Sequence, residues 1–224
     1  MGNQWIDLSQ DYYENMPPAK VRSDMAYKIK TLAHSDENQR AQVNLQQFTI
    51  ASHQGTHLDA FKHLFRDGKT IDQIPLERFA GSGVVLDISN KKGGEAIIAQ
   101  ELEKAKPEVK SGDIVIIHTG WEEKWHSDDY FDHPYFSLDA AQWLVDKKVK
   151  MFGMDTLTPD IPHYLRTETF DFPIHRLILG NDIIIIENLG NLSAVAGKRV
   201  TIVAFPLKII GADGSPGRVA AMVE

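Results

Sequence analysis

Short runs of β-branched and other apolar residues recur along the chain from residue 83 onward, each bounded by Gly, Asp, Asn or Pro. Runs of this length and composition are typical of strands that are buried on both faces. They predict four strands, at residues 83–88, 113–120, 182–189 and 199–207.

Helical periodicity lies between these runs, at residues 93–109 and 137–149. Ser137 is a suitable N-cap for the second segment, and Asp139 is favourable in its first turn. Because strands and helices alternate here, the pattern indicates an α/β or mixed α+β fold.

The N-terminal part has a different pattern. Residues 26–33 and 41–52 read as two strands joined by a polar hairpin, whereas the Pro- and Gly-containing segment 211–219 reads as a turn or loop. The expected architecture is therefore a mixed sheet, antiparallel early in the chain and flanked by helices. A length of 224 residues predicts one domain over residues 1–224.

Composition narrows the range of partners. The chain has 31 acidic and 24 basic residues and a net charge of -7, which argues against nucleic acid or an anionic membrane as a partner. The chain has no cysteine, so disulfides, thiolate metal sites and a cysteine nucleophile are excluded. The polar N-terminus and the lack of a long apolar run predict a soluble, cytoplasmic protein.

Residues 53–63 contain three histidines and one aspartate, namely His53, His57, Asp59 and His63. One helix cannot bring all four together, since side chains turn by about 100° per residue. An extended segment would place them on one face but far apart. A bend at Gly55 would allow His53 and His57 to approach one ion with Asp59 facing it.

Two imidazoles and one carboxylate suit catalytic zinc, manganese or iron(II) better than a hard alkaline-earth ion. The alternative is a polar loop that is rich in histidine and binds no metal. From the composition alone, both interpretations of this segment remain open.

A second group of polar residues lies downstream, where His175 precedes and Glu187 closes an apolar strand pattern. A carboxylate after four isoleucines is costly to bury unless it is neutralised. Glu187 therefore either lies at the exposed end of the strand or, with His175, binds a second ion that Asp59 bridges.

The segment HQGTHLDAFKH resembles the signature H-x-G-T-H-x-D-x-P-x-H of the cyclase family of metal-dependent hydrolases, which includes kynurenine formamidases and isatin hydrolases. Five further segments resemble family segments in the same order: IDLSQDYYENMP, IIHTGWEEKW, GMDTLTPD, HRLILGNDIIIIENLGNL and PLKIIGADGSPGRVAA. One departure is visible, because Phe61 occupies the position of the proline.

The resemblance implies one or two divalent ions per chain, with Zn²⁺ or Mn²⁺ expected. The implied ligands are His53, His57 and Asp59 for the first ion, and Asp59, His175 and Glu187 for a second. His63 is the implied general acid/base. The resemblance also implies a swivelling β/β/α fold and a homodimer or higher homo-oligomer.

These features predict hydrolysis of an amide or lactam C–N bond in a small molecule, in the manner of an arylformamidase, by hydroxide formed at the metal. N-Formylkynurenine is the first substrate to assay. Phe61, Phe65 and Trp121 either form a wall for a planar substrate or belong to the core.

Three alternatives differ in class. The protein could be a metal-dependent cyclase or lyase that does not use water, a metal-binding homologue without catalysis, or a globular domain whose histidines bind no ion.

Overall fold

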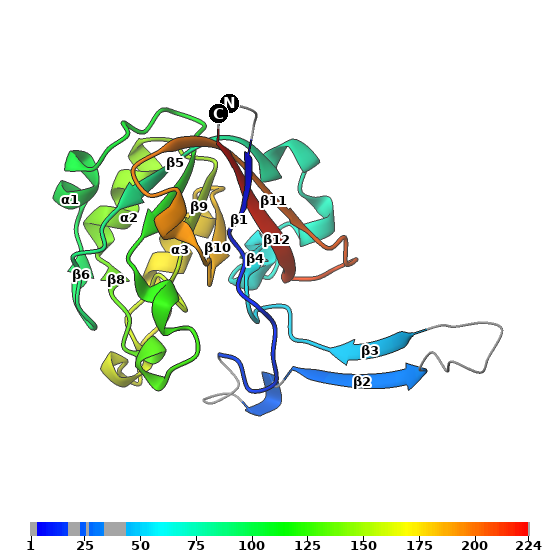
Figure 1. Ribbon diagram of the computed structural model, residues 1–224. Coiled ribbons are helices and arrows are strands. Elements are labelled where there is room, and N and C mark those ends of the chain that lie inside the picture. Colours follow the sequence, from blue (N-terminus) through cyan, green and yellow to red (C-terminus); the bar gives the residue numbers. More distant parts are fainter. Residues whose placement is uncertain (1–3, 18–22, 26, 34–43, 224) are drawn as a thin grey trace.

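The computed structural model of the protein describes residues 4–17, 23–25, 27–33 and 44–223 (Figure 1). A mixed eight-stranded sheet lies at its centre, in the order β1-β12-β11-β5-β7-β9-β10-β4. Its strands are β1 (Gln4–Asp7), β4 (His57–Asp59), β5 (Ala80–Asp87), β7 (Ile114–His118), β9 (Met151–Met154), β10 (Ile184–Glu187), β11 (Arg199–Pro206) and β12 (Gly214–Val223).

The sheet has a parallel half and an antiparallel half. Strands β5, β7, β9 and β10 are parallel to their neighbours in this group, whereas β1, β11, β12 and β4 pair antiparallel. Strand β4 also pairs with β12, so the sheet closes into a barrel-like ring. The predicted mixed sheet is confirmed.

Three of the four parallel strands are buried along their whole length. Every residue of β7, β9 and β10 is buried, as expected for parallel strands that are covered on both faces. The predicted strands at 83–88, 113–120, 182–189 and 199–207 correspond to β5, β7, β10 and β11.

Three helices lie together beside the parallel strands: α1 (Ala99–Lys104), α2 (Leu138–Asp146) and α3 (Pro173–Gly180) (Figure 1). The hydroxyl of Ser137 accepts a hydrogen bond from the Ala140 amide, so the predicted N-cap of α2 is present. Pro173 begins α3, where its missing N–H does no harm.

The structure differs from the sequence pattern in three segments. Within 93–109, only α1 is α-helical, because Ala96–Ile97 forms β6 and pairs in parallel with β8 (Tyr135–Phe136), and Pro107 cannot donate a backbone hydrogen bond. The predicted loop 211–219 is wrong from Gly214 onward, where β12 begins. His175 precedes β10 as expected, but it lies inside α3, a helix that the sequence pattern did not predict.

The two N-terminal strands form a separate antiparallel ribbon of β2 (Lys28–Ala33) and β3 (Leu45–Thr49), as predicted. The ribbon projects away from the sheet and helices (Figure 1). The predicted hairpin between the two strands lies outside the described residues.

Short 3-10 turns join many of these elements. They are η1 (Ser23–Met25), η2 (Phe61–His63), η3 (Ile71–Gln73), η4 (Leu76–Phe79), η5 (Trp121–Lys124), η6 (Asp128–Phe131), η7 (His163–Leu165) and η8 (Leu192–Ala194). Within the described part of the chain, no helix has the length and apolar character needed to cross a membrane.

Candidate metal centre

Strand β4 lies between β10 and β12, and this position brings distant parts of the chain together. His57 faces Glu187 of β10 on one side and Pro216 of β12 on the other. Asp59 lies two residues further along β4, and therefore on the same face of the strand as His57. The closure of the sheet thus builds a histidine–carboxylate cluster.

The chain bends at Gly55, immediately before β4. Gly55 has a φ of 63°, and a Cβ at this position would lie 2.6 Å from the Tyr12 ring. Both features favour glycine. The bend allows Nδ1 of His53 to lie 2.7 Å from Oδ1 of Asp59.

The imidazoles of His57 and His175 are each held through Nδ1. Nδ1 of His57 lies 2.8 Å from the carbonyl oxygen of Gly55, and Nδ1 of His175 lies 2.5 Å from Oδ2 of Asp160. Asp160 also accepts the backbone N–H of Ile174 and is fully buried. These contacts leave Nε2 of both rings facing the interior of the cluster.

The two carboxylates of the cluster lie between these rings. Nε2 of His57 is 3.3 Å from an oxygen of Asp59 and 3.3 Å from an oxygen of Glu187. Nε2 of His175 is 3.4 Å from Asp59 and 3.1 Å from Glu187. All four side chains are buried, so Glu187 does not lie at an exposed strand end.

His63 and Asp213 lie at the more exposed side of the cluster. The ring of His63 packs against that of His53, with centroids 3.8 Å apart. One oxygen of Asp213 is 2.9 Å from Nε2 of His53 and 3.5 Å from Nδ1 of His63. The turn η2, which follows β4, places His63 here.

Opposite charges dominate the electrostatics of the cluster. Burial lowers the pKa of His53 and His57, but neighbouring carboxylates outweigh burial and raise the pKa to about 9 for His53 and about 10 for His57. For His175, Asp160, Asp59 and Glu187 outweigh burial in the same way, and its pKa lies well above the usual range. The imidazolium form is therefore favoured at neutral pH in the absence of another cation.

The carboxylates shift in the opposite direction. Burial raises the pKa of Asp59, but the three imidazoles hold it well below the usual range. The pKa of Glu187 is also lowered, because His175 and His57 outweigh burial and the charge of Asp59.

The cluster meets the chemical requirements of a divalent cation. Four buried atoms form no hydrogen bond with a described residue, although charged groups lie 3.1–3.5 Å from them: Nε2 of His57, Oδ2 of Asp59, Oε1 of Glu187 and Nδ1 of His63. Such atoms are costly unless something binds them. Three overlapping groups have ligand atoms within 4.8 Å of one another: His53, His57 and Asp59; His53, His63 and Asp213; and Asp59, His63 and His175.

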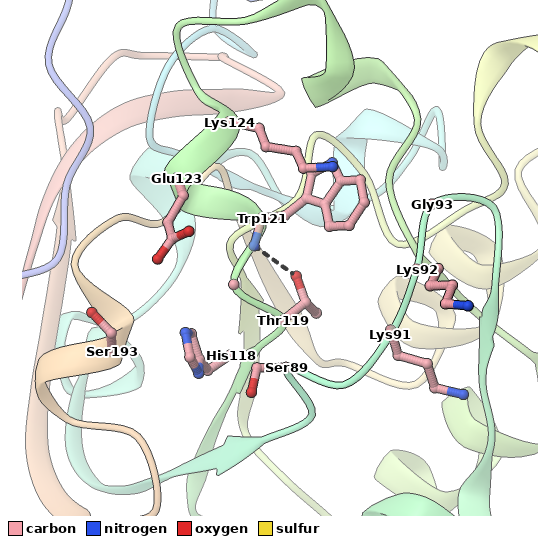
Figure 2. A pocket seen from close by; sticks show the side chains of 11 residues that line it. Ser89, Lys91, Lys92, Gly93, His118, Thr119, Trp121, Glu123, Lys124 and Ser193 are labelled. Atoms are coloured by element: carbon pink, nitrogen blue, oxygen red, sulfur yellow. Dashed lines mark hydrogen bonds between the residues drawn. The ribbon is translucent and has the colours of Figure 1, made fainter.

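The three aromatic residues singled out from the sequence lie in different surroundings. Phe61 belongs to the main core, and Phe65 packs against this core. Trp121 is buried, and its Nε1 donates to the carbonyl of Tyr130. Trp121 also lines a separate cavity of about 510 Å³ (Figure 2). Contact of any of the three with a substrate stays a prediction.

The carboxylate of Asp155 caps the turn that follows β7. It accepts hydrogen bonds from the backbone N–H groups of Thr119 and Trp121 and from the Thr119 hydroxyl. Burial raises the pKa of Asp155 to about 6.

Sequence reasoning missed Asp160 and Asp213, which contact His175 and His53. Both lie within segments that resemble family segments, GMDTLTPD and PLKIIGADGSPGRVAA. An acidic residue inside these segments was the available signal. The spacing of residues along the chain does not show that Asp160 contacts His175 or that Asp213 contacts His53.

The closed mixed sheet and this buried cluster place the protein in a class whose site is lined by histidines and carboxylates and suits a divalent metal. A family model described as putative cyclase matches residues 6–161, which is more than half of the chain. The protein belongs to this cyclase family.

Relatives and solved structures extend the comparison to nearly the whole chain. A kynurenine formamidase of Bacillus anthracis is 28% identical over 217 residues, which cover 96% of each chain. Isatin hydrolase A from Ralstonia solanacearum has a TM-score of 0.87 and 28% identity, covering 99% of this chain and 92% of its own. A structure described as a predicted metal-dependent hydrolase from Bacillus stearothermophilus has a TM-score of 0.79 and 26% identity, covering 99% of each chain.

Proposed function

We propose that this protein is a metal-dependent hydrolase that cleaves an amide or lactam C–N bond, other than a peptide bond, in a small molecule. The observation that carries this proposal is the buried cluster of His57, Asp59, His175 and Glu187, whose unpartnered atoms converge between the strands. The relatives named kynurenine formamidase and isatin hydrolase support this reaction class.

The proposed ligands of a first ion are His53, His57 and Asp59, and Asp59 with His175 and Glu187 would hold a second. Zn²⁺ and Mn²⁺ suit these nitrogen and oxygen donors. A bound ion would supply Lewis acidity and lower the pKa of water from about 15.7 toward 7. Gly55 and Asp160 orient the rings by binding Nδ1 of His57 and His175.

His63 is the proposed proton carrier. It lies at the less buried side of the cluster, 3.5 Å from Asp213 and next to the ring of His53. An imidazole in this position can take a proton from the attacking water and deliver one to the leaving nitrogen. Asp213 orients the ring of His63 for this transfer.

Aryl formamides such as N-formylkynurenine are the proposed substrates, with Phe61, Phe65 and Trp121 as candidate contacts. The proposal also includes one domain over residues 1–224, a cytoplasmic location, and a homodimer or higher homo-oligomer. The pairing of β1 with β12 supports one domain, because it joins both ends of the described chain to one sheet.

Metal analysis of the untagged protein tests the metal part of this proposal. We expect one or two ions per chain after reconstitution with Zn²⁺ or Mn²⁺. Because the pKa of His53 is raised to about 9 and that of His57 to about 10, ion binding must displace protons at pH 7. Calorimetry in two buffers of different ionisation enthalpy should show proton release, and metal affinity should rise with pH toward 9.

Hydrolysis of N-formylkynurenine and isatin by each reconstituted form tests the reaction, with ¹⁸O-labelled water as the solvent. Label in the product supports hydrolysis, whereas an unlabelled product would indicate a cyclase or lyase reaction. Stoichiometric metal without turnover would indicate a binding protein, and the absence of stoichiometric metal would contradict the proposed centre.

A further inference from the structure

Arg166 differs from four other arginines of the described chain in what surrounds its charge. Arg78, Arg176, Arg199 and Arg218 each form an ion pair with an aspartate. Arg166 forms no ion pair with a described residue. Its Nε donates to the carbonyl of Ile161 at 3.0 Å, and neither Nη1 nor Nη2 has a hydrogen-bond partner among the described residues.

Two aromatic rings hold the guanidinium of Arg166 in place. Its central carbon lies 4.6 Å from the ring centroid of Phe170 and 5.1 Å from that of Phe172. Cation–π contacts of this kind leave the outer N–H groups of a guanidinium available to an anion.

Phe172 connects Arg166 to the metal centre. The ring of Phe172 packs edge-on against the imidazole of His175, with centroids 5.8 Å apart. Arg166 therefore lies one aromatic ring away from a proposed metal ligand.

The backbone at Phe172 supports a functional role for this arrangement. Phe172 has a φ of 58°, which is unusual for a large side chain and carries strain. It occupies the N-cap position of α3, where its side chain forms no capping hydrogen bond. The conformation directs the ring between Arg166 and His175, and strained residues of this kind cluster at functional sites.

The charge of Arg166 is only partly balanced by its surroundings. Burial lowers the pKa of Arg166, while the nearby carboxylates of Asp160 and Glu187 raise it by a smaller amount. Asp160 is already bound to His175, and Glu187 faces His57 and His175. The half-buried guanidinium thus remains a cation with unused donors close to the centre.

We propose that Arg166 binds a carboxylate of the substrate, so that the site prefers amides that carry a carboxylate at some distance from the scissile C–N bond. The planar fork of arginine matches a carboxylate through two parallel N–H···O bonds. This inference rests on the proposed function, because it assumes that the reacting bond lies at the histidine–carboxylate cluster.

A matched pair of substrates tests the proposal on the metal-loaded protein. N-Formylkynurenine carries a carboxylate, and 2-formamidoacetophenone has the same aryl formamide without the amino-acid group. For Arg166→Met, we expect kcat/KM for N-formylkynurenine to fall about 10–100-fold, mainly through KM. The value for 2-formamidoacetophenone should stay unchanged, and Arg166→Lys should recover part of the loss.

Arg176→Met is the matched control, because Arg176 lies on α3 and is half-exposed beside Asp171. Its kinetic constants should match those of the wild type. An equal loss of activity on both substrates in Arg166→Met would overturn the proposal and assign Arg166 a structural role. Metal content and thermal unfolding identify a variant that has failed to fold. If Arg166→Met fails to fold, the same comparison of the two substrates is made with Arg166→Lys.

A binding measurement separates this inference from the proposed reaction. Calorimetry with kynurenine and with 2-aminoacetophenone does not require turnover. We expect Arg166→Met to weaken kynurenine binding selectively, and equal weakening or no change for both ligands would overturn the proposal. If the wild type hydrolyses neither formamide, the proposed function fails, while the binding result still decides the role of Arg166.

Discussion

The histidines of the candidate centre have the same side chain but different partners, and these partners separate their roles. Nδ1 of His57 and of His175 is bound by a fixed oxygen, so each ring presents Nε2 to the cluster. Nδ1 of His63 has only a contact at 3.5 Å with Asp213. A ring whose Nδ1 is held by an oxygen presents Nε2 in a fixed direction, which suits a metal ligand. A less restrained ring suits proton transfer.

Replacement of His63 by alanine tests this division of roles. We expect His63→Ala to retain its metal and to lose activity by roughly 10²–10⁴-fold, because a general acid/base is removed. Metal analysis and steady-state kinetics measure the two effects. His163→Ala, which removes an exposed histidine from η7, is the control and should behave as the wild type. Loss of the metal from His63→Ala would instead make His63 a ligand.

At the scale of single residues, the sequence predicted six residues that the structure brings together. His53, His57, Asp59 and His63 come from one segment. Glu187 joins them through the pairing of β4 with β10, and His175 joins them from α3. The sequence did not predict Asp160, Asp213 or Arg166, because their partners are determined only by folding. Phe61 replaces the proline of the signature and is accommodated in the main core.

At the scale of elements, short strands explain part of what the sequence pattern did not predict. Strand β4 has three residues and β6 has two, and neither length produces a detectable periodicity. The segment 211–219 looked like a loop because of its Gly and Pro residues, yet Gly214 must pass His53 closely. A Cβ at Gly214 would lie 2.7 Å from Cε1 of His53.

The bend at Gly55 leads to a prediction about β4. Gly55→Ala should destabilise the protein by about 1–3 kcal/mol, since alanine resists a positive φ and its Cβ would overlap the Tyr12 ring. It should also weaken metal binding, because the Gly55 carbonyl holds His57. Denaturant unfolding and metal titration measure both effects.

Gly197→Ala is the control for the backbone alone. Gly197 has a φ of 72°, but a Cβ there meets nothing within 4 Å. Gly55→Ala should therefore be the more destabilising of the two and the only one that changes metal affinity. Equal losses of stability would show that the Tyr12 ring moves aside without cost.

At the scale of the whole molecule, closure of the sheet makes the centre possible. Residues 57–59 pair with residues 185–187 on one side and 214–216 on the other. Periodicity in the sequence can indicate that a strand exists, but not which strand lies beside it. The mixed character of the sheet was therefore predictable, whereas the closure by β4 and β12 was not.

The β2–β3 ribbon carries several exposed apolar side chains away from the main sheet. Ile29 and Phe48 face each other across the two strands, and they are 42% and 60% exposed. Leu32 and Leu45 of the same ribbon are also exposed. A two-stranded ribbon is marginally stable alone in water, so cover by a second copy of the chain would stabilise it. This supports the proposed homo-oligomer.

Phe48→Ser tests whether the ribbon forms the contact between copies. We expect light scattering coupled to size exclusion to give the mass of a dimer or higher oligomer for the wild type and a smaller mass for Phe48→Ser. Leu76→Ser is the control, because Leu76 is 66% exposed on η4 and its loss should leave the mass unchanged. A monomeric wild type would contradict the homo-oligomer. Loss of an aromatic anchor from an interface should weaken association. If Phe48→Ser stays oligomeric and dissociates on dilution no more readily than the wild type, the contact between copies lies elsewhere.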